Sequence, residues 1–131
     1  MSANAANKTR IYFIATAAYW LVFGLITTFY PRLMDIFQTE AGINAKTKFS
    51  DHIWLHDGLD IICVSILLFM LSREAVSRNM LQATAVVAAL VTFAIVYSLL
   101  TTPYWGVLFI VPAAGCFFFT IWGFVLSKRA G

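Results

Sequence analysis

The sequence predicts an all-α membrane protein that folds as an antiparallel bundle of four membrane-spanning helices. Of its 131 residues, 61% are hydrophobic and only 11% are charged, whereas charged residues make up about 25% of a typical soluble domain. Three apolar runs approach the roughly 20 residues that a helix needs to cross a bilayer. The second run, Ile61–Leu71, is too short alone and reaches that length only if its helix starts near Ile53. We expect one domain covering residues 1–131, with spans at about 11–30, 53–72, 80–100 and 105–126.

The first span is expected to end at Pro31, because a proline ring clashes with the preceding helical turn. One side of this span carries ring and hydroxyl groups spaced three or four residues apart, which places them on one face of a helix. We expect that face to point into the bundle. Its members are Tyr12, Thr16, Tyr19, Phe23 and Thr27.

The connection between the first two spans is the longest in the chain. The segment Leu33–Phe37 has its apolar residues spaced for one face of a short helix, so we expect it to lie along the membrane interface. Gly42 is predicted to end this piece, and Ser50 is predicted to cap the second membrane helix.

The third and fourth spans carry small residues on one face each. Lipid tails compete for apolar side chains, so membrane helices associate where small residues let their backbones approach closely. Short links should make consecutive spans antiparallel neighbours. Ser77 and the pair Thr102-Pro103 are the expected helix starts. The two small faces comprise Ala85, Ala88, Ala89 and Thr92, and Ala113, Cys116, Thr120, Gly123 and Ser127.

Positive charge is concentrated on one side of the predicted bundle. Six cations flank the spans on the side of the termini, and three lie in the long connection. Cytoplasmic loops carry the excess of Lys and Arg, so the pattern predicts both termini inside. We therefore expect a multi-pass integral membrane protein, in a membrane that the sequence does not name, with the bilayer as its main partner. The cations are too dispersed to indicate nucleic-acid binding.

Titratable side chains gather at the start of the second span. His52, His56 and Asp60 follow one another at a spacing of four residues, and Asp57 lies beside them. A carboxylate at the bilayer centre costs about 2.5–3.5 kcal/mol on insertion scales, and such residues usually line a bundle interior or a wet cavity. Asp60, His56 and Asp57 are therefore candidate catalytic residues.

Three interpretations of this cluster stay open. The helix could begin late, leaving most of the cluster solvated among lipid headgroups. Asp60 could act as an acid or base, with His56 holding or exchanging its proton. His52, His56 and Asp60 could bind a metal such as zinc or iron, although a third strong ligand is not obvious. The sequence identifies no cofactor.

Residues at matching depth on the other spans suggest where a ligand could bind. Phe23 and Thr27 of the first span lie at a level similar to that of Asp60, as do Thr92 and Tyr97 of the third. Trp54 lies one helical turn before the acidic pair. These five residues are the predicted lining of a cavity that would also contact His56, Asp57 and Asp60.

The layout resembles the small four-helix membrane proteins of the DoxX-like superfamily. The resemblance rests on the first span closed by Pro31, on Leu33–Phe37, on Asp57-Gly58-Leu59, and on the approach to the last helix through Pro103-Tyr104-Trp105-Gly106. It covers most of the chain, with loosely defined motifs. It implies the same four-helix fold, with roles as an accessory subunit of a quinone-linked oxidoreductase or as a scaffold for enzymes.

Two functions from different classes follow. The first is a small accessory or scaffold subunit of a membrane complex, working with other membrane subunits or with further copies of itself. The second is a membrane-embedded enzyme that carries out acid–base chemistry on an apolar substrate such as an isoprenoid, a sterol or a quinone. In the second, Asp60 is the acid or base and His56 orients it.

Overall fold

The chain folds into four long helices joined by short helical segments, as predicted. The computed structural model describes residues 3–74 and 76–129, with side chains from residue 6 onward except 48, 49 and 51. Each long helix is apolar and long enough to cross a membrane. The elements are α1 (Ala3–Phe29), η1 (Pro31–Phe37), α2 (Glu40–Asn44), α3 (Lys48–Leu71), α4 (Arg78–Thr101), η2 (Val107–Phe109) and α5 (Ile110–Arg129), where η marks a 3₁₀ helix.

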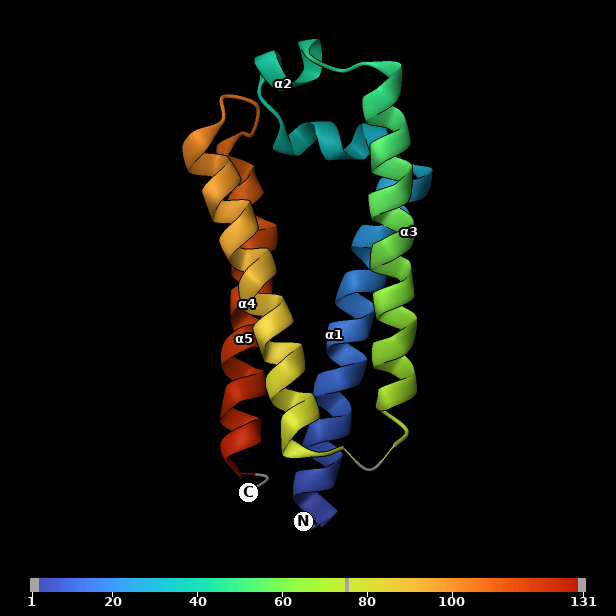
Figure 1. Ribbon diagram of the computed structural model, residues 1–131, viewed down its shortest axis with the longest axis vertical. Helices are drawn as coiled ribbons and strands as arrows, with labels where there is room; N and C mark the ends of the chain where they lie inside the picture. Colours follow the sequence, from blue (N-terminus) through green and yellow to red (C-terminus); the bar gives the residue numbers. More distant parts are fainter. Residues whose placement is uncertain (1–2, 75, 130–131) are drawn as a thin grey trace.

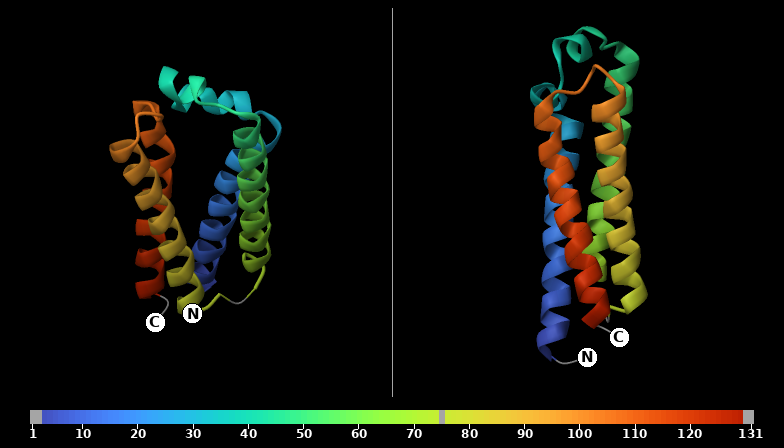
Figure 2. Two further views of the ribbon diagram at one scale, coloured as in Figure 1. Left: turned by 45° about the horizontal axis from the view of Figure 1, so that its top comes forward. Right: turned by 90° about the vertical axis from the view of Figure 1, so that its left-hand side faces the viewer.

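The four long helices associate as two pairs, α1 with α3 and α4 with α5 (Figure 1). The pairs touch each other mainly where α1 meets α5. Both termini lie at one end of the bundle, which we call the proximal end, and the link between η1 and α3 lies at the distal end (Figures 1 and 2). The prediction that consecutive spans are packed neighbours is correct for α4 and α5 but wrong for α3 and α4, which hardly touch.

The first pair is held by close backbone approach. Gly58 of α3 packs on α1, where a Cβ atom would lie 2.2 Å from Thr28 Oγ1 and 2.8 Å from the Thr28 nitrogen. Gly24 of α1 lies on the other side of this contact. A Cβ atom at Gly24 would lie 3.0 Å from the Gly58 oxygen. Ser65 Oγ donates a 2.7 Å hydrogen bond to the Ala17 oxygen. Small residues thus bring the helices together, as expected in a bilayer.

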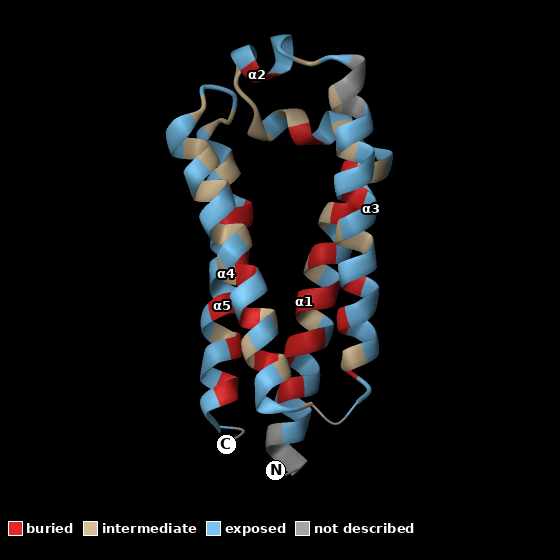
Figure 3. Cartoon of the chain, in the orientation of Figure 1, coloured by how far each residue is buried: buried red, intermediate tan, exposed pale blue. Residues whose placement is uncertain are grey.

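The second pair uses the two small-residue faces predicted from the sequence. Ala85 and Ala88 of α4 are buried, and so are all five members of the α5 face. A Cβ atom at Gly123 would come within 2.9 Å of the Ala85 Cβ. Figure 3 shows the buried positions gathered on the inward sides of the helices, while exposed apolar surface covers the outward sides.

Several helix boundaries differ from the predictions, each for a local reason. The helix α1 begins at Ala3, because the alanine-rich start continues the apolar span. Thr47 caps α3 and Ser50 is its third residue, so Ser50 completes a capping box instead of being the cap. Gly42 lies inside α2 and does not end it. Ser77 caps α4 as predicted.

The last span begins later than the pair Thr102-Pro103 suggested. Thr102 is the C-cap of α4, and the chain becomes helical again at Val107, after Gly106. The helix α5 then starts at Ile110, so Pro112 falls in its first turn. A missing N–H is tolerated there, because first-turn amides have no partner within the helix.

Backbone hydrogen bonds join the two pairs at the distal end. We call η1 and α2, residues 31–44, the distal strap. The Thr39 nitrogen donates to the Tyr104 oxygen at 2.9 Å, and the Gly106 nitrogen donates to the Phe37 oxygen at 2.7 Å. Thr39 Oγ1 adds a 2.6 Å bond to the Pro103 oxygen. The strap connects α1 to α3 in the chain but is hydrogen-bonded to the link between α4 and α5. It therefore bridges the two helix pairs (Figure 2).

Candidate functional site

An apolar cavity of about 250 Å³ lies between the two helix pairs in the distal half of the bundle. Every helical element of the distal half except α2 contributes to its wall. Its lining is dominated by aromatic and aliphatic groups, with few polar atoms. The lining residues are Tyr19, Trp20, Phe23, Thr27, Met34, Trp54, Asp57, Ile61, Val91, Ile95, Trp105, Phe109, Pro112 and Cys116.

Stacked rings form the distal wall of the cavity. The Trp105 ring stacks on Phe109, with centroids 4.1 Å apart. Trp54 of α3 meets Trp105 edge to face at 5.8 Å. Aromatic pairs in these arrangements contribute about 0.5–1.5 kcal/mol beyond their buried area. The contact between Trp54 and Trp105 also joins the first helix pair to the segment that leads into the second.

The deep end of the cavity is set by Tyr19. Its hydroxyl donates a 2.8 Å hydrogen bond to the Pro112 oxygen, which ties α1 to α5. Its ring lies 5.0 Å from that of Phe23, and both line the cavity. Trp20 and Cys116 belong to the same deep end and lie close to the middle of their spans. The cavity therefore extends from the distal boundary towards mid-membrane.

Asp57 is the one charged side chain among the described residues that line the cavity. It precedes Gly58, which packs on Thr28, and α1 ends one residue later at Phe29. The carboxylate consequently lies at the level where the first span ends. There it combines partial solvation with access to the apolar interior, and the full cost of a charge at the bilayer centre does not apply.

His52, His56, Asp57 and Asp60 are all exposed, and of these four only Asp57 also lines this cavity. Residues of a helix advance by about 100° each, so His56 and Asp60 lie roughly opposite Gly58, which faces α1. Asp57 and Trp54 lie to one side of Gly58, towards the cavity. The expected cavity contacting His56, Asp57 and Asp60 together is thus wrong for His56 and Asp60, and their catalytic role stays a prediction.

The predicted ligand-binding residues divide into two groups. Phe23, Thr27 and Trp54 line the cavity, as expected. Tyr97 is 58% exposed and stacks on Phe93, with centroids 6.0 Å apart, on the outward side of α4. The Thr92 hydroxyl donates a 2.8 Å hydrogen bond to the Ala88 oxygen of its own helix. Tyr97 and Thr92 were chosen because they lie at the depth of Asp60, but depth does not show which side of a helix faces inward. On α4 the cavity is lined by Val91 and Ile95 instead.

The three predicted metal ligands all lie on α3. Among the described residues, no three His, Cys, Asp or Glu side chains come together as a metal site requires. The proposed set of His52, His56 and Asp60 follows one helix face outward, without a ligand from a second element. Cys63 and Cys116 are both free thiols, the first exposed and the second buried.

Sequence reasoning missed the rings contributed by the link and by η2. Both Trp105 and Phe109 fall within the last span as predicted, at about 105–126, without an assigned role in the cavity. The available signal was the spacing of four between them, which stacks the two rings once the segment is helical. Met34 could not be placed from the sequence, because its position depends on where the distal strap is bonded.

Comparisons with other proteins do not bear on this site. No protein-family model matches the chain, and searches of curated proteins and of solved structures give no match. The fold and the cavity geometry therefore carry the functional argument.

Proposed function

We propose that this small multi-pass membrane protein is an accessory protein that binds one amphiphilic molecule between its two helix pairs. The apolar body of the ligand would lie among the rings of the cavity, and its polar end would lie beside Asp57. The observation that carries the proposal is the cavity itself, which is largely apolar and has one carboxylate at its distal rim.

The size of the cavity supports a ring-sized ligand segment. An engineered apolar cavity of about 150 Å³ binds benzene, and this one measures about 250 Å³. Drug-sized pockets run from about 300 to 1,000 Å³. A ring with a short chain would fit inside, and a longer tail would pass out between the helix pairs. Isoprenoid alcohols and quinols, which end in a hydroxyl group, have this form.

The distribution of polarity supports an oriented ligand. Trp20 and Cys116 line the deep part, whereas Asp57 lies at the boundary of the span. An amphiphile placed with its polar end at the distal boundary matches both. A cationic or hydrogen-bond-donating end group is favoured, because an ionised carboxylate only accepts hydrogen bonds.

An accessory role accounts for this arrangement without requiring catalysis. His56 and Asp60 do not line the cavity with Asp57, so binding of a ligand there does not depend on them. The proposal keeps the resemblance to DoxX-like proteins as an expectation about the role, in which the bound molecule would serve a larger membrane complex.

Quenching of tryptophan fluorescence tests the binding site. Trp20, Trp54 and Trp105 line the cavity, so a bromine-carrying amphiphile bound there should quench them. We expect bromododecylamine to quench at lower concentration than bromododecanol, and bromododecanoate to be weakest. Asp57→Asn should remove this order, whereas Asp60→Asn, on the outward face, should keep it. Loss of the order in both variants, or in neither, would contradict the assignment to Asp57.

Filling the cavity provides a second test with a matched control. Val91 lines the cavity, while Val87, one turn away on α4, is 47% exposed. Val91→Phe should weaken bromododecanol binding on the order of tenfold, because the added ring takes the space of the ligand. Val87→Phe should leave it unchanged. Equal quenching curves for the two variants would place binding elsewhere.

The second candidate is an enzyme, and the carboxyl of Asp57 is the observation that favours it. A carboxyl group beside an apolar substrate can act as an acid or base, with His56 and Asp60 as neighbours on the same helix. This hypothesis predicts that Asp57→Asn abolishes turnover of an isoprenoid, sterol or quinone in proteoliposomes while binding survives. Mass spectrometry of the extracted lipids checks it, and an unchanged lipid profile with the unaltered protein opposes it.

A further inference from the structure

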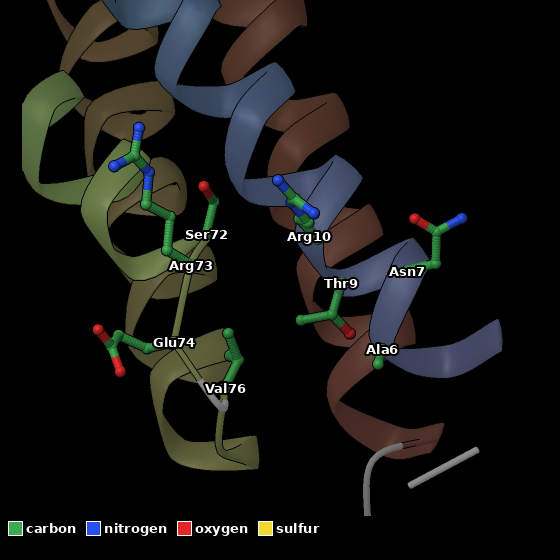
Figure 4. A pocket seen from close by; sticks show the side chains of 8 residues that line it. All are labelled: Ala6, Asn7, Thr9, Arg10, Ser72, Arg73, Glu74 and Val76. Atoms are coloured by element: carbon green, nitrogen blue, oxygen red, sulfur yellow. The ribbon is translucent and has the colours of Figure 1, made fainter. Parts of the chain in front are cut away.

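A second pocket, separate from the apolar cavity, lies at the proximal end of the molecule. It measures about 530 Å³ and opens between the first turns of α1 and the link that joins α3 to α4. Figure 4 shows the side chains around it. The lining residues are Ala6, Asn7, Thr9, Arg10, Ser72, Arg73, Glu74 and Val76.

Two arginines from different segments line this pocket. Arg10 belongs to α1, and Arg73 follows the end of α3. Glu74 also lines the pocket, but Figure 4 shows its carboxylate turned away from Arg10. Among the residues whose side chains the structure describes, neither arginine forms an ion pair; the ion pair found there joins Lys46 to Asp35 at the distal end. Both arginines are thus available to an external anion.

The depth of the pocket matches that of a lipid headgroup. The candidate span in α1 begins at Ala6, and the one in α3 ends at Leu71, so the pocket straddles the boundary of the apolar zone. The exposed side chains next to it on the membrane side are apolar: Ile11 is 48% exposed, Phe69 44% and Met70 60%. A molecule held here would have its charge at the arginines and its tails along apolar helix surfaces.

Arg73 contacts an aromatic ring of its own helix, and Figure 4 shows its guanidinium turned away from Arg10, so both arginines can hold one phosphate only after Arg73 changes its rotamer. Its guanidinium carbon lies 4.8 Å from the centre of the Phe69 ring, one helical turn earlier, which is a cation–π contact. A guanidinium presents a planar fork of donors that suits phosphate oxygens.

We propose that this proximal pocket binds the phosphate of an anionic phospholipid in the leaflet nearest the chain termini. Arg10 and Arg73 would hold the phosphate oxygens from two sides, and Asn7 would donate from its amide. Basic pockets between membrane helices are known to recognise such headgroups. The site is independent of the apolar cavity at the distal end.

Spin-labelled lipids test the proposal on the full chain in phosphatidylcholine vesicles. Electron paramagnetic resonance would give the association of labelled phosphatidylglycerol relative to labelled phosphatidylcholine. We expect the unaltered protein to prefer phosphatidylglycerol, and R10Q/R73Q to lose that preference on the order of tenfold. Absence of a preference in the unaltered protein would overturn the proposal.

Two further variants separate a built site from general charge. R78Q/R129Q removes the same charge from exposed positions outside the pocket and should largely keep the preference. R10K/R73K keeps the charge but loses the planar fork, so its preference should fall. An equal loss in R78Q/R129Q, or full retention in R10K/R73K, would overturn the proposal. Circular dichroism would confirm the helical fold of each variant.

Inorganic phosphate distinguishes a lipid from a soluble anion. A site for the lipid uses contacts of the tails as well as the headgroup, so millimolar phosphate should not displace labelled phosphatidylglycerol. Displacement by phosphate in the unaltered protein, absent in R10Q/R73Q, would assign the pocket to a soluble anion and overturn the lipid assignment.

Discussion

At the scale of single residues, close backbone contacts determine how the distal end is assembled. Gly42 lies in α2, and a Cβ atom there would come within 2.3 Å of the Tyr104 oxygen. Gly106, on the other side of the same contact, would place a Cβ atom no nearer than 3.5 Å to its neighbours. The two glycines therefore differ in the space that they leave for a side chain, although both belong to the bridge between the helix pairs.

This difference predicts opposite effects for the same substitution. Gly42→Ala should destabilise the protein by about 1–3 kcal/mol, because backbone atoms on both sides must move apart. Gly106→Ala should be neutral or should stabilise by about 0.4–1 kcal/mol, because its backbone is already extended and alanine restricts the unfolded chain. Thermal unfolding in one detergent checks both. A higher melting temperature for Gly42→Ala would contradict the described contact.

At the scale of elements, the sequence predicted which segments are helical better than it predicted which face of each helix points inward. The four spans and the segment 33–37 were found because composition and length decide them. The inward face of α1 was also predicted correctly: Tyr12 and Thr16 are fully buried, and Thr27 is 3% exposed.

The helix α3 shows why rotation was harder to predict. Its most polar stripe suggested an inward face, but the contact with α1 uses Gly58 and Ser65 on the opposite side. In a membrane, close packing of small residues decides the contact, and polar residues near the distal boundary can remain solvated. A pattern of polarity alone could not choose between these two sides.

Thiol labelling checks the rotation of α3 and α5 together. Cys63 shares the outward stripe with Asp60 and is exposed, while Cys116 is 2% exposed. A membrane-soluble maleimide should modify Cys63 in the folded protein and leave Cys116 largely unmodified until the protein is denatured. Cys63→Ser should abolish labelling of the folded chain. Similar labelling rates for both thiols in peptide mass spectra would refute this arrangement.

At the scale of the whole molecule, the length of the links did not predict which helices pair. Short links predicted α3 beside α4, yet α3 packs on α1, and α4 packs on α5. A link sets only the largest distance between helix ends, whereas matched small faces set the partner. The cavity exists because the pairs separate between their proximal contact and the distal strap, so its lining was only partly predictable.

The charge distribution predicts the orientation of the whole molecule. Six Lys and Arg residues flank the proximal end, against three at the distal end, which favours a cytoplasmic proximal end. In a cysteine-free background, Ala45→Cys should react with an impermeant maleimide on intact cells. Ala6→Cys, exposed at the other end, should react only after permeabilisation. The reverse pattern would invert the orientation.

The hydrogen bonds of the distal strap have a consequence for how a ligand reaches the cavity. Because Thr39 and Phe37 are hydrogen-bonded across the distal end, we expect the distal strap to hinder direct passage from the aqueous phase. The remaining route is lateral, from the hydrocarbon between the helix pairs. Occupancy would then follow the mole fraction of the ligand in the bilayer and not its concentration in water, so the protein would sample molecules already dissolved in the membrane.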